Sequence, residues 1–167
     1  WITLALGVAG LLLVLLFHHH VEQELAERAR SQLDALIAGL SLDTAAPPRL
    51  TLQAEPPDPA FRQPLGGWYW LVSVNGMPLL RSRSWWDQAP PALPDGSARQ
   101  LRTDGPAGQK LLLWTRSVEL AGLESPVIVA VGADATRLQG LTRSFATTVA
   151  AALAALALAL WAAAWLQ

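Results

Sequence analysis

The side chains best suited to binding a ligand lie in one short run, residues 81–87, with the sequence RSRSWWD. In an extended strand, Arg81, Arg83 and Trp85 would share one face, because successive side chains alternate between the two faces. Two guanidinium groups beside an indole could hold an anionic ligand through bidentate hydrogen bonds and stacking. The alternative is that each arginine pairs with an acid, or stacks on a Trp, as part of the fold.

A second aromatic group precedes this run, at residues 66–70, GGWYW. Aromatic side chains of this size usually fill the core of a small domain. In a strand, however, at least one of these rings must point away from the core, where it could cover a membrane, a dimer face or a ligand. The candidate ligand-binding residues are therefore Tyr69, Arg81, Arg83, Trp85 and Trp86.

The chain offers few side chains for catalysis or for metal binding. Its three histidines are the adjacent residues 18–20, and successive helical residues point about 100° apart, so they cannot all bind one ion. Glu55 and Asp58 lie in one proline-rich loop, but calcium recruits about 6 to 8 oxygens. Cysteine is absent, which excludes a thiol enzyme. We expect no catalytic residues and no metal site.

The elements that position these residues begin with two uncharged apolar segments. None of the 12 basic and 13 acidic residues lies in 1–21 or 144–167. Residues 146–166 match the roughly 30 Å hydrocarbon core as a helix. Residues 1–20 are expected to form a first transmembrane helix with a truncated start, because the chain begins at Trp and no signal-peptide cleavage site follows. The membrane is therefore a predicted partner.

The charges between these segments are balanced, since all 12 basic and 13 acidic residues lie there. A nucleic acid or an anionic surface usually selects an excess of basic residues. We therefore expect no nucleic-acid partner.

Residues 21–43 are predicted to form a juxtamembrane segment that is helical as far as Leu42. Apolar residues recur every three or four positions, which places them on one stripe. The stripe can pack on the domain's own sheet, or form the seam of a parallel homodimer; one helix can do both at different heights. The predicted seam residues are Leu25, Ala29, Leu33, Leu36 and Leu40.

Residues 44–134 read as a sheet domain. After the break at Pro47 and Pro48, strands are predicted at 50–53, 68–74, 79–85, 99–103, 110–120 and 126–132. Asn75 and Gly76 supply the residue types that a type I′ turn needs, so the strands on either side should form a hairpin.

Asp134 is placed to cap a closing helix, because its carboxylate can accept hydrogen bonds from the free amides of the first turn. Residues 135–145 should form an exit helix that continues into the second span at 146–166. The predicted fold is thus α+β: an antiparallel sheet flanked by helices and inserted between two transmembrane helices.

Four segments stand out: 61–70 (FRQPLGGWYW), 80–87 (LRSRSWWD), 105–109 (GPAGQ) and 129–134 (VAVGAD). Together they resemble the periplasmic sensor region of bacterial two-component sensor histidine kinases. The chain departs from the family pattern at Gly66, Leu71 and Trp85, where Ser, Gln and Leu are common, so no ligand residues are carried over.

The resemblance implies a PAS-like periplasmic domain in a two-pass protein of the bacterial inner membrane, acting as a homodimer. Its stimulus would be an unknown periplasmic ligand or protein. The parent protein would carry a kinase domain that uses ATP and Mg and signals to a cytoplasmic response regulator, whereas these residues need no cofactor. The same sensor could instead serve a chemoreceptor or a cyclic-dinucleotide enzyme, or the domain could be a non-signalling envelope scaffold.

Overall fold

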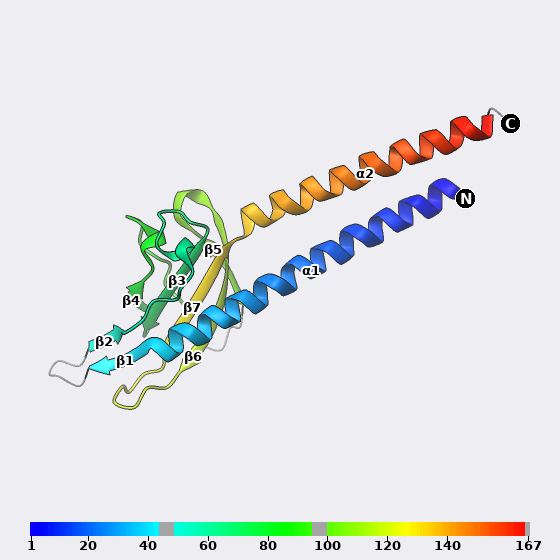
Figure 1. Cartoon of the computed structure of the whole chain (residues 1–167). Helices are drawn as coiled ribbons and strands as arrows, with labels where there is room; N and C mark the ends of the chain where they lie inside the picture. The colour runs from blue at the N-terminus through cyan, green and yellow to red at the C-terminus, as the bar shows by residue number, and fades with distance from the viewer. Residues whose placement is uncertain (44–48, 95–99, 166–167) are drawn as a thin grey trace. The chain divides into compact units, whose positions relative to one another are not determined.

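The computed structural model describes residues 1–43, 49–94 and 100–165 (Figure 1). Its elements are α1 (Ile2–Gly39), β1 (Leu40–Asp43), β2 (Arg49–Leu52), η1 (Pro59–Phe61), β3 (Trp68–Val74), β4 (Met77–Arg81), η2 (Arg83–Trp85), β5 (Gln100–Asp104), η3 (Pro106–Gly108), β6 (Lys110–Val118), β7 (Val127–Asp134) and α2 (Ala135–Trp165). Two compact units divide the chain: Trp1–Glu24 with Arg137–Gln167, and Leu25–Thr136. The predicted break at Pro47 and Pro48, the strand start at residue 99 and the end of the second span at residue 166 lie outside the described residues.

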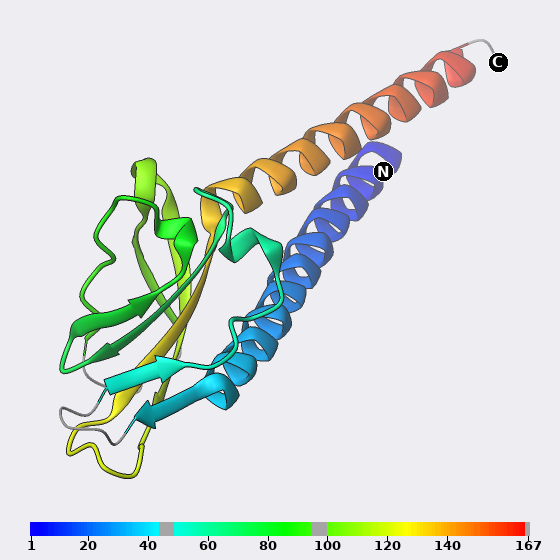
Figure 2. The ribbon, with the colours of Figure 1, turned by 60° about the vertical axis from the view of Figure 1, so that its left-hand side comes forward.

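The helix predicted to reach Leu42 ends earlier. α1 stops at Gly39, and β1 starts at the next residue. β1 then pairs with β2 from Leu40↔Leu52 onward, in a two-stranded antiparallel ribbon that Figure 2 shows directly after the helix. Leucines alternate with polar residues in both strands, a period-two pattern that favours pairing over another helical turn.

A five-stranded antiparallel sheet forms most of the unit Leu25–Thr136, in the order β4-β3-β7-β6-β5. β3 pairs with β7 along its full length, from Trp68↔Ala133 to Val74↔Val127. β6 pairs with the other side of β7, which leaves β4 and β5 at the edges. The α+β class and the antiparallel sheet between helices are therefore confirmed.

The turn predicted between β3 and β4 is present. Asn75 and Gly76 have φ of 52° and 73°, and a type I′ turn requires positive φ at both central residues. β4, however, ends at Arg81 rather than at Trp85 as predicted, because residues 83–85 form the 3-10 turn η2. The second predicted hairpin joins β5 to β6.

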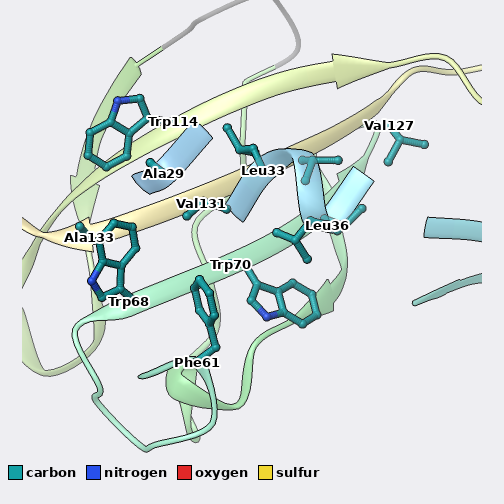
Figure 3. Packing of buried hydrophobic residues seen from close by; sticks show 12 residues of the cluster. Ala29, Leu33, Leu36, Phe61, Trp68, Trp70, Trp114, Val127, Val131 and Ala133 are labelled. Carbon is teal, nitrogen blue, oxygen red and sulfur yellow. The ribbon is translucent and has the colours of Figure 1, made fainter. Parts of the chain in front are cut away.

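One face of the sheet packs against the part of α1 that belongs to this unit. Because side chains alternate along each strand, every second residue of β3 and β7 reaches this face. The core includes Ala29, Leu33, Leu36, Phe61, Trp68, Trp70, Trp114, Val127, Val131 and Ala133 (Figure 3). The opposite face carries a second core without a helix, made of Tyr69, Leu71, Trp85, Leu93, Leu111, Leu113, Ile128 and Ala130.

The other unit holds the two apolar helical segments. The helical stretches Leu4–Gly39, which continues into the sheet domain, and Thr142–Ala163 are long and apolar enough to cross a membrane, and each contains an 18-residue window with a mean hydropathy of 2.0. This arrangement is compatible with a two-pass membrane protein.

The two segments of this unit contact each other in antiparallel fashion. The rings of Phe17 and Phe145 stack with centroids 4.0 Å apart. Farther along, a Cβ added to Gly10 would clash with Cδ1 of Leu153. The leucine therefore occupies the space left by the missing side chain of the glycine.

The junction between β7 and α2 has no intervening linker, because α2 starts at Ala135 directly after the strand. The amide of Thr136 donates to Oδ1 of Asp134 at 2.9 Å, which confirms the predicted cap. The amide of Lys110 donates to Oγ1 of Thr136 at 3.2 Å and ties the first turn of α2 to β6. Gly140 does not interrupt α2, so the exit helix and the second apolar segment form one helix.

Candidate ligand-binding site

A hollow of about 530 Å³ lies beside the end of β4. Small-molecule sites in proteins commonly enclose about 300 to 1,000 Å³. The lining residues are Glu55, Arg81, Ser82, Arg83, Trp86 and Asp87. The structure thus brings together three of the predicted ligand-binding residues, Arg81, Arg83 and Trp86.

Ser82 is the reason why the strand ends where the hollow begins. Its hydroxyl accepts a hydrogen bond from the amide of Trp70 at 3.0 Å, and its own amide donates to the carbonyl of Trp70 at 2.9 Å. The same hydroxyl is 2.7 Å from that of Ser84, and both serines are buried. These bonds satisfy buried polar groups that would otherwise be costly, so the chain can leave the sheet at this point.

The side chains of Trp85 and Trp86 lie on opposite sides of residues 82–87, one buried and one exposed. Trp85 is 1% exposed, and its indole Nε1 donates to the carbonyl of Trp70 at 3.1 Å. Trp86 is 60% exposed and has φ 54° and ψ −124°, a conformation rare for a residue with a side chain. The predicted common face of Arg81, Arg83 and Trp85 is therefore not formed, because η2 replaces the strand.

Tyr69, the remaining predicted ligand-binding residue, is also placed in the core. It is fully buried, with its ring centroid 5.1 Å from that of Trp85. Its hydroxyl donates to Oε1 of Gln109 at 2.6 Å. Burial raises the pKa of Tyr69, so the phenol stays protonated. Tyr69 and Trp85 belong to the second core and do not line the hollow.

The two arginines of the hollow differ in how they are held. Nη1 of Arg81 donates to the carbonyl of Gln88 at 2.6 Å and so closes the loop after η2. Within residues 1–43, 49–94 and 100–165, the guanidinium of Arg83 has no hydrogen bond or ion pair. One arginine is thus structural and the other is available.

Two acidic residues, Glu55 and Asp87, were not among the predicted ligand-binding residues. Oε2 of Glu55 is 4.0 Å from Nε of Arg62, whereas the carboxylate of Asp87 has no such partner in the described part of the chain. Asp87 directly follows Trp86 in the sequence, so its place beside the other candidate ligand-binding residues could have been predicted. Glu55 precedes β3 and reaches the hollow only through the fold.

Sequence reasoning also missed an ion pair between a buried aspartate and a half-exposed arginine. Asp58, whose side chain is 8% exposed, accepts hydrogen bonds from Nη2 of Arg28 and from the amide of Ala60. The Arg28 guanidinium also lies 4.8 Å from the ring centroid of Trp68. Burial alone would raise the pKa of Asp58, but the hydrogen bonds from Arg28 and Ala60 and the charge of Arg28 outweigh it and lower the pKa. The pair anchors the loop before η1 to α1.

In the part of the chain that the structure describes, no three His, Cys, Asp or Glu side chains are grouped so that they could hold a metal ion. His18 lies 3.2 Å from Glu22, and His19 lies 3.0 Å from Gln23, each one helical turn along α1. Asp58 is engaged by Arg28, so it is not available to share a cation with Glu55.

The predicted dimer seam lies in the core of the domain. Ala29, Leu33 and Leu36 are 0%, 3% and 0% exposed, and they contact the β3–β7 face of the sheet. Leu25 and Leu40 are partly buried against the same core. Packing on the domain's own sheet therefore accounts for Ala29, Leu33 and Leu36, and it accounts in part for Leu25 and Leu40.

No protein-family model, curated protein or solved structure matches this chain. Its function is therefore inferred from the geometry of the hollow and of the two helices.

Proposed function

We propose that this chain is the extracytoplasmic signal-sensing and transmembrane relay region of a bacterial two-component sensor histidine kinase. The sheet domain would lie in the periplasm, between two spans of the inner membrane. Kinase domains beyond this chain would use ATP and Mg and would signal to a cytoplasmic response regulator. The observation that carries the proposal is that each long helix runs unbroken between a membrane-length apolar segment and the sheet domain.

The helix α1 supports a relay because its later turns are part of the domain core. Leu33 and Leu36 pack against β3 and β7, so α1 cannot move independently of the sheet without opening that core. An unbroken helix transmits such a displacement along its axis, whereas a flexible Gly/Ser linker would absorb it.

The helix α2 supports a relay in a different way. It follows the central strand β7 without a linker, and the Asp134 cap and the Lys110 contact fix its first turn. A change in β7 would therefore reach α2 directly. A ligand that prefers one arrangement by about 1 to 3 kcal/mol would suffice for a useful response.

A PAS-like description of the domain draws support from the five-stranded antiparallel sheet with a helix against one face. A homodimer is part of the proposal as well. Because the predicted seam is used by the core, a dimer would have to use the exposed side of α1, which carries Glu27, Arg30 and Ala38, or the membrane segments.

Two other classes share some of these features. A chemoreceptor or a cyclic-dinucleotide enzyme could use the same relay with a different output domain. A non-signalling envelope scaffold would need the membrane anchors but no unbroken helices, so the continuity of α1 and α2 favours signalling.

A chimera tests the relay. Residues 1–167 are fused in register to the HAMP and kinase domains of a characterised histidine kinase, and autophosphorylation is measured in membranes. One to four alanines are then inserted after Arg143 in α2. Each insertion rotates the following helix by about 100°, so kinase activity should vary with insertion length and return towards the starting level near four residues.

The matched control places the same insertions after Gly122, in the exposed loop between β6 and β7. These should leave the activity unchanged. In the same membranes, an Ala121→Cys variant should react with a membrane-impermeant thiol reagent from the periplasmic side. If no insertion in α2 changes the kinase activity, the relay is contradicted and the scaffold is favoured.

A further inference from the structure

We propose that the hollow at the end of β4 binds a small zwitterionic molecule with an apolar body. Its anionic group would bind Arg83, its ammonium group Asp87, and its body the indole of Trp86. The proposal deepens the proposed function by naming the chemical class of the sensed ligand.

The charged side chains of the hollow indicate which charges the ligand carries. Four charged side chains line it, and two are already engaged: Arg81 by the Gln88 carbonyl, and Glu55 by Arg62. In the described part of the chain, the side chains of Arg83 and Asp87 have no such contacts. One positive and one negative group are thus left available in the same hollow.

This pairing favours a ligand with both charges over one with a single charge. A guanidinium binds a carboxylate or phosphate with two parallel hydrogen bonds, and a carboxylate accepts readily from an ammonium group. An anion would satisfy Arg83 but would bring like charge close to Asp87, and a cation would do the reverse. Only a zwitterion complements both groups.

Trp86 indicates that the ligand also has an apolar body. Its indole is 60% exposed, while its backbone has φ 54° and ψ −124°. Such strained backbone positions cluster at ligand sites, where the surrounding structure holds them in place. Here the holding contacts are the buried Trp85 before it and the hydrogen bond from the Gln88 amide to the Trp85 carbonyl after it.

An indole that is kept exposed in this way offers a flat apolar face inside a charged hollow. It can stack on an apolar or aromatic body, and it attracts an ammonium group through its ring electrons. The volume of about 530 Å³ suits a small molecule, and the buried Ser82 is part of the lining. These features together select the class of ligand.

Three probes that share a phenylethyl body test the class directly: L-phenylalanine carries both charges, 3-phenylpropanoate only the anionic group and 2-phenylethylamine only the ammonium group. The chain is labelled with 5-fluorotryptophan in lipid nanodiscs, and the ¹⁹F resonance of Trp86 is assigned by its loss in Trp86→Phe. L-Phenylalanine should shift this resonance saturably. Each single-charge analogue should bind at least about tenfold more weakly, because it loses the charge-assisted hydrogen bonds of one group.

Two variants assign each charge to its partner. Arg83→Gln should reduce the affinity for L-phenylalanine to that of 2-phenylethylamine, and Asp87→Asn should reduce it to that of 3-phenylpropanoate. Arg102→Gln, a change at an exposed position of β5, is the matched control and should change nothing.

The proposal is overturned if no probe shifts the Trp86 resonance saturably, or if all three bind equally. It is also overturned if binding depends on Arg83 but not on Asp87, which would indicate a simple anion site. Binding is measured without a kinase domain, so failure here is distinguishable from failure of the relay.

Discussion

The two faces of the central sheet are covered in contrasting ways. α1 covers one face with Ala29, Leu33 and Leu36, whose helical spacing matches an apolar sheet surface. On the other face, residues 82–94 supply Trp85 and Leu93 to the core without forming a helix or strand beyond η2. A regular helix satisfies its own backbone hydrogen bonds. Where the irregular segment leaves the sheet, the buried Ser82 hydroxyl instead accepts from the amide of Trp70 in β3.

This difference separates two tasks within one domain. The helix face is continuous and apolar, which suits the transmission of force. The irregular face leaves charged and aromatic groups exposed at its border, which suits recognition. Both faces share β7, the central strand that leads into α2, so a displacement on one face can reach the other.

The largest expected effect contrasts the two adjacent tryptophans on the irregular face. Trp85→Ala removes a fully buried indole and its hydrogen bond to Trp70, and should lower the free energy of unfolding by about 3 to 5 kcal/mol. Trp86→Ala removes an exposed side chain and should change it by less than about 1 kcal/mol. Urea unfolding of the chain in detergent micelles, followed by near-UV circular dichroism, measures both.

Comparable losses for the two variants would mean that Trp86 is packed as tightly as Trp85. The division between core and hollow would then be wrong.

A smaller effect is expected on the helix face. Leu36→Ala should cost about 2 to 5 kcal/mol, because it opens a cavity between α1 and the sheet. Leu79→Ala, at an exposed position of β4, is the matched control and should be nearly neutral. The same unfolding assay applies. Loss of stability in the control but not in Leu36→Ala would show that α1 does not pack on the sheet.

The smallest effect concerns the ion pair at the edge of the helix face. Asp58→Asn should lower stability at pH 7 by about 1 to 2 kcal/mol, because Arg28 is half exposed and solvent weakens the pair. The pKa of Asp58 is lower in the folded state, so the contribution is complete above the unfolded pKa of about 4 and is lost as pH falls through the folded pKa.

The difference between wild type and Asp58→Asn should therefore shrink below about pH 4. Asp104→Asn, which removes an exposed pair with Lys110, is the control and should show little effect at either pH. A difference for Asp58→Asn that stays constant down to pH 3 would contradict the assigned role.

Much of this fold follows from local patterns in the sequence. Aromatic and β-branched residues identified β3, an apolar run identified β7, and the Asn75-Gly76 pair identified β4 as the hairpin partner of β3. Asp134 identified the start of α2. These signals are local, because each depends on a few adjacent residues and on backbone preferences.

The hollow was predictable only in part. The charge and ring types of Arg81, Arg83 and Trp86 were visible in the sequence, but the turn that sends Trp85 inward depends on Ser82 bonding to Trp70 across the sheet. Glu55 and the Arg28–Asp58 pair likewise depend on contacts between distant segments. Periodicity cannot reveal such contacts, because they arise from tertiary packing.

The packing of Leu153 against Gly10 has a consequence for how the two apolar segments respond to lipid composition. With Leu153 packed on Gly10 and Phe17 stacked on Phe145, the two apolar segments are held in one register. In the bilayer that we propose for them, we expect the segments to adapt to a different thickness by tilting as a pair, because sliding would separate Leu153 from Gly10. The acyl-chain length of the surrounding lipids would thus act on both helices at once.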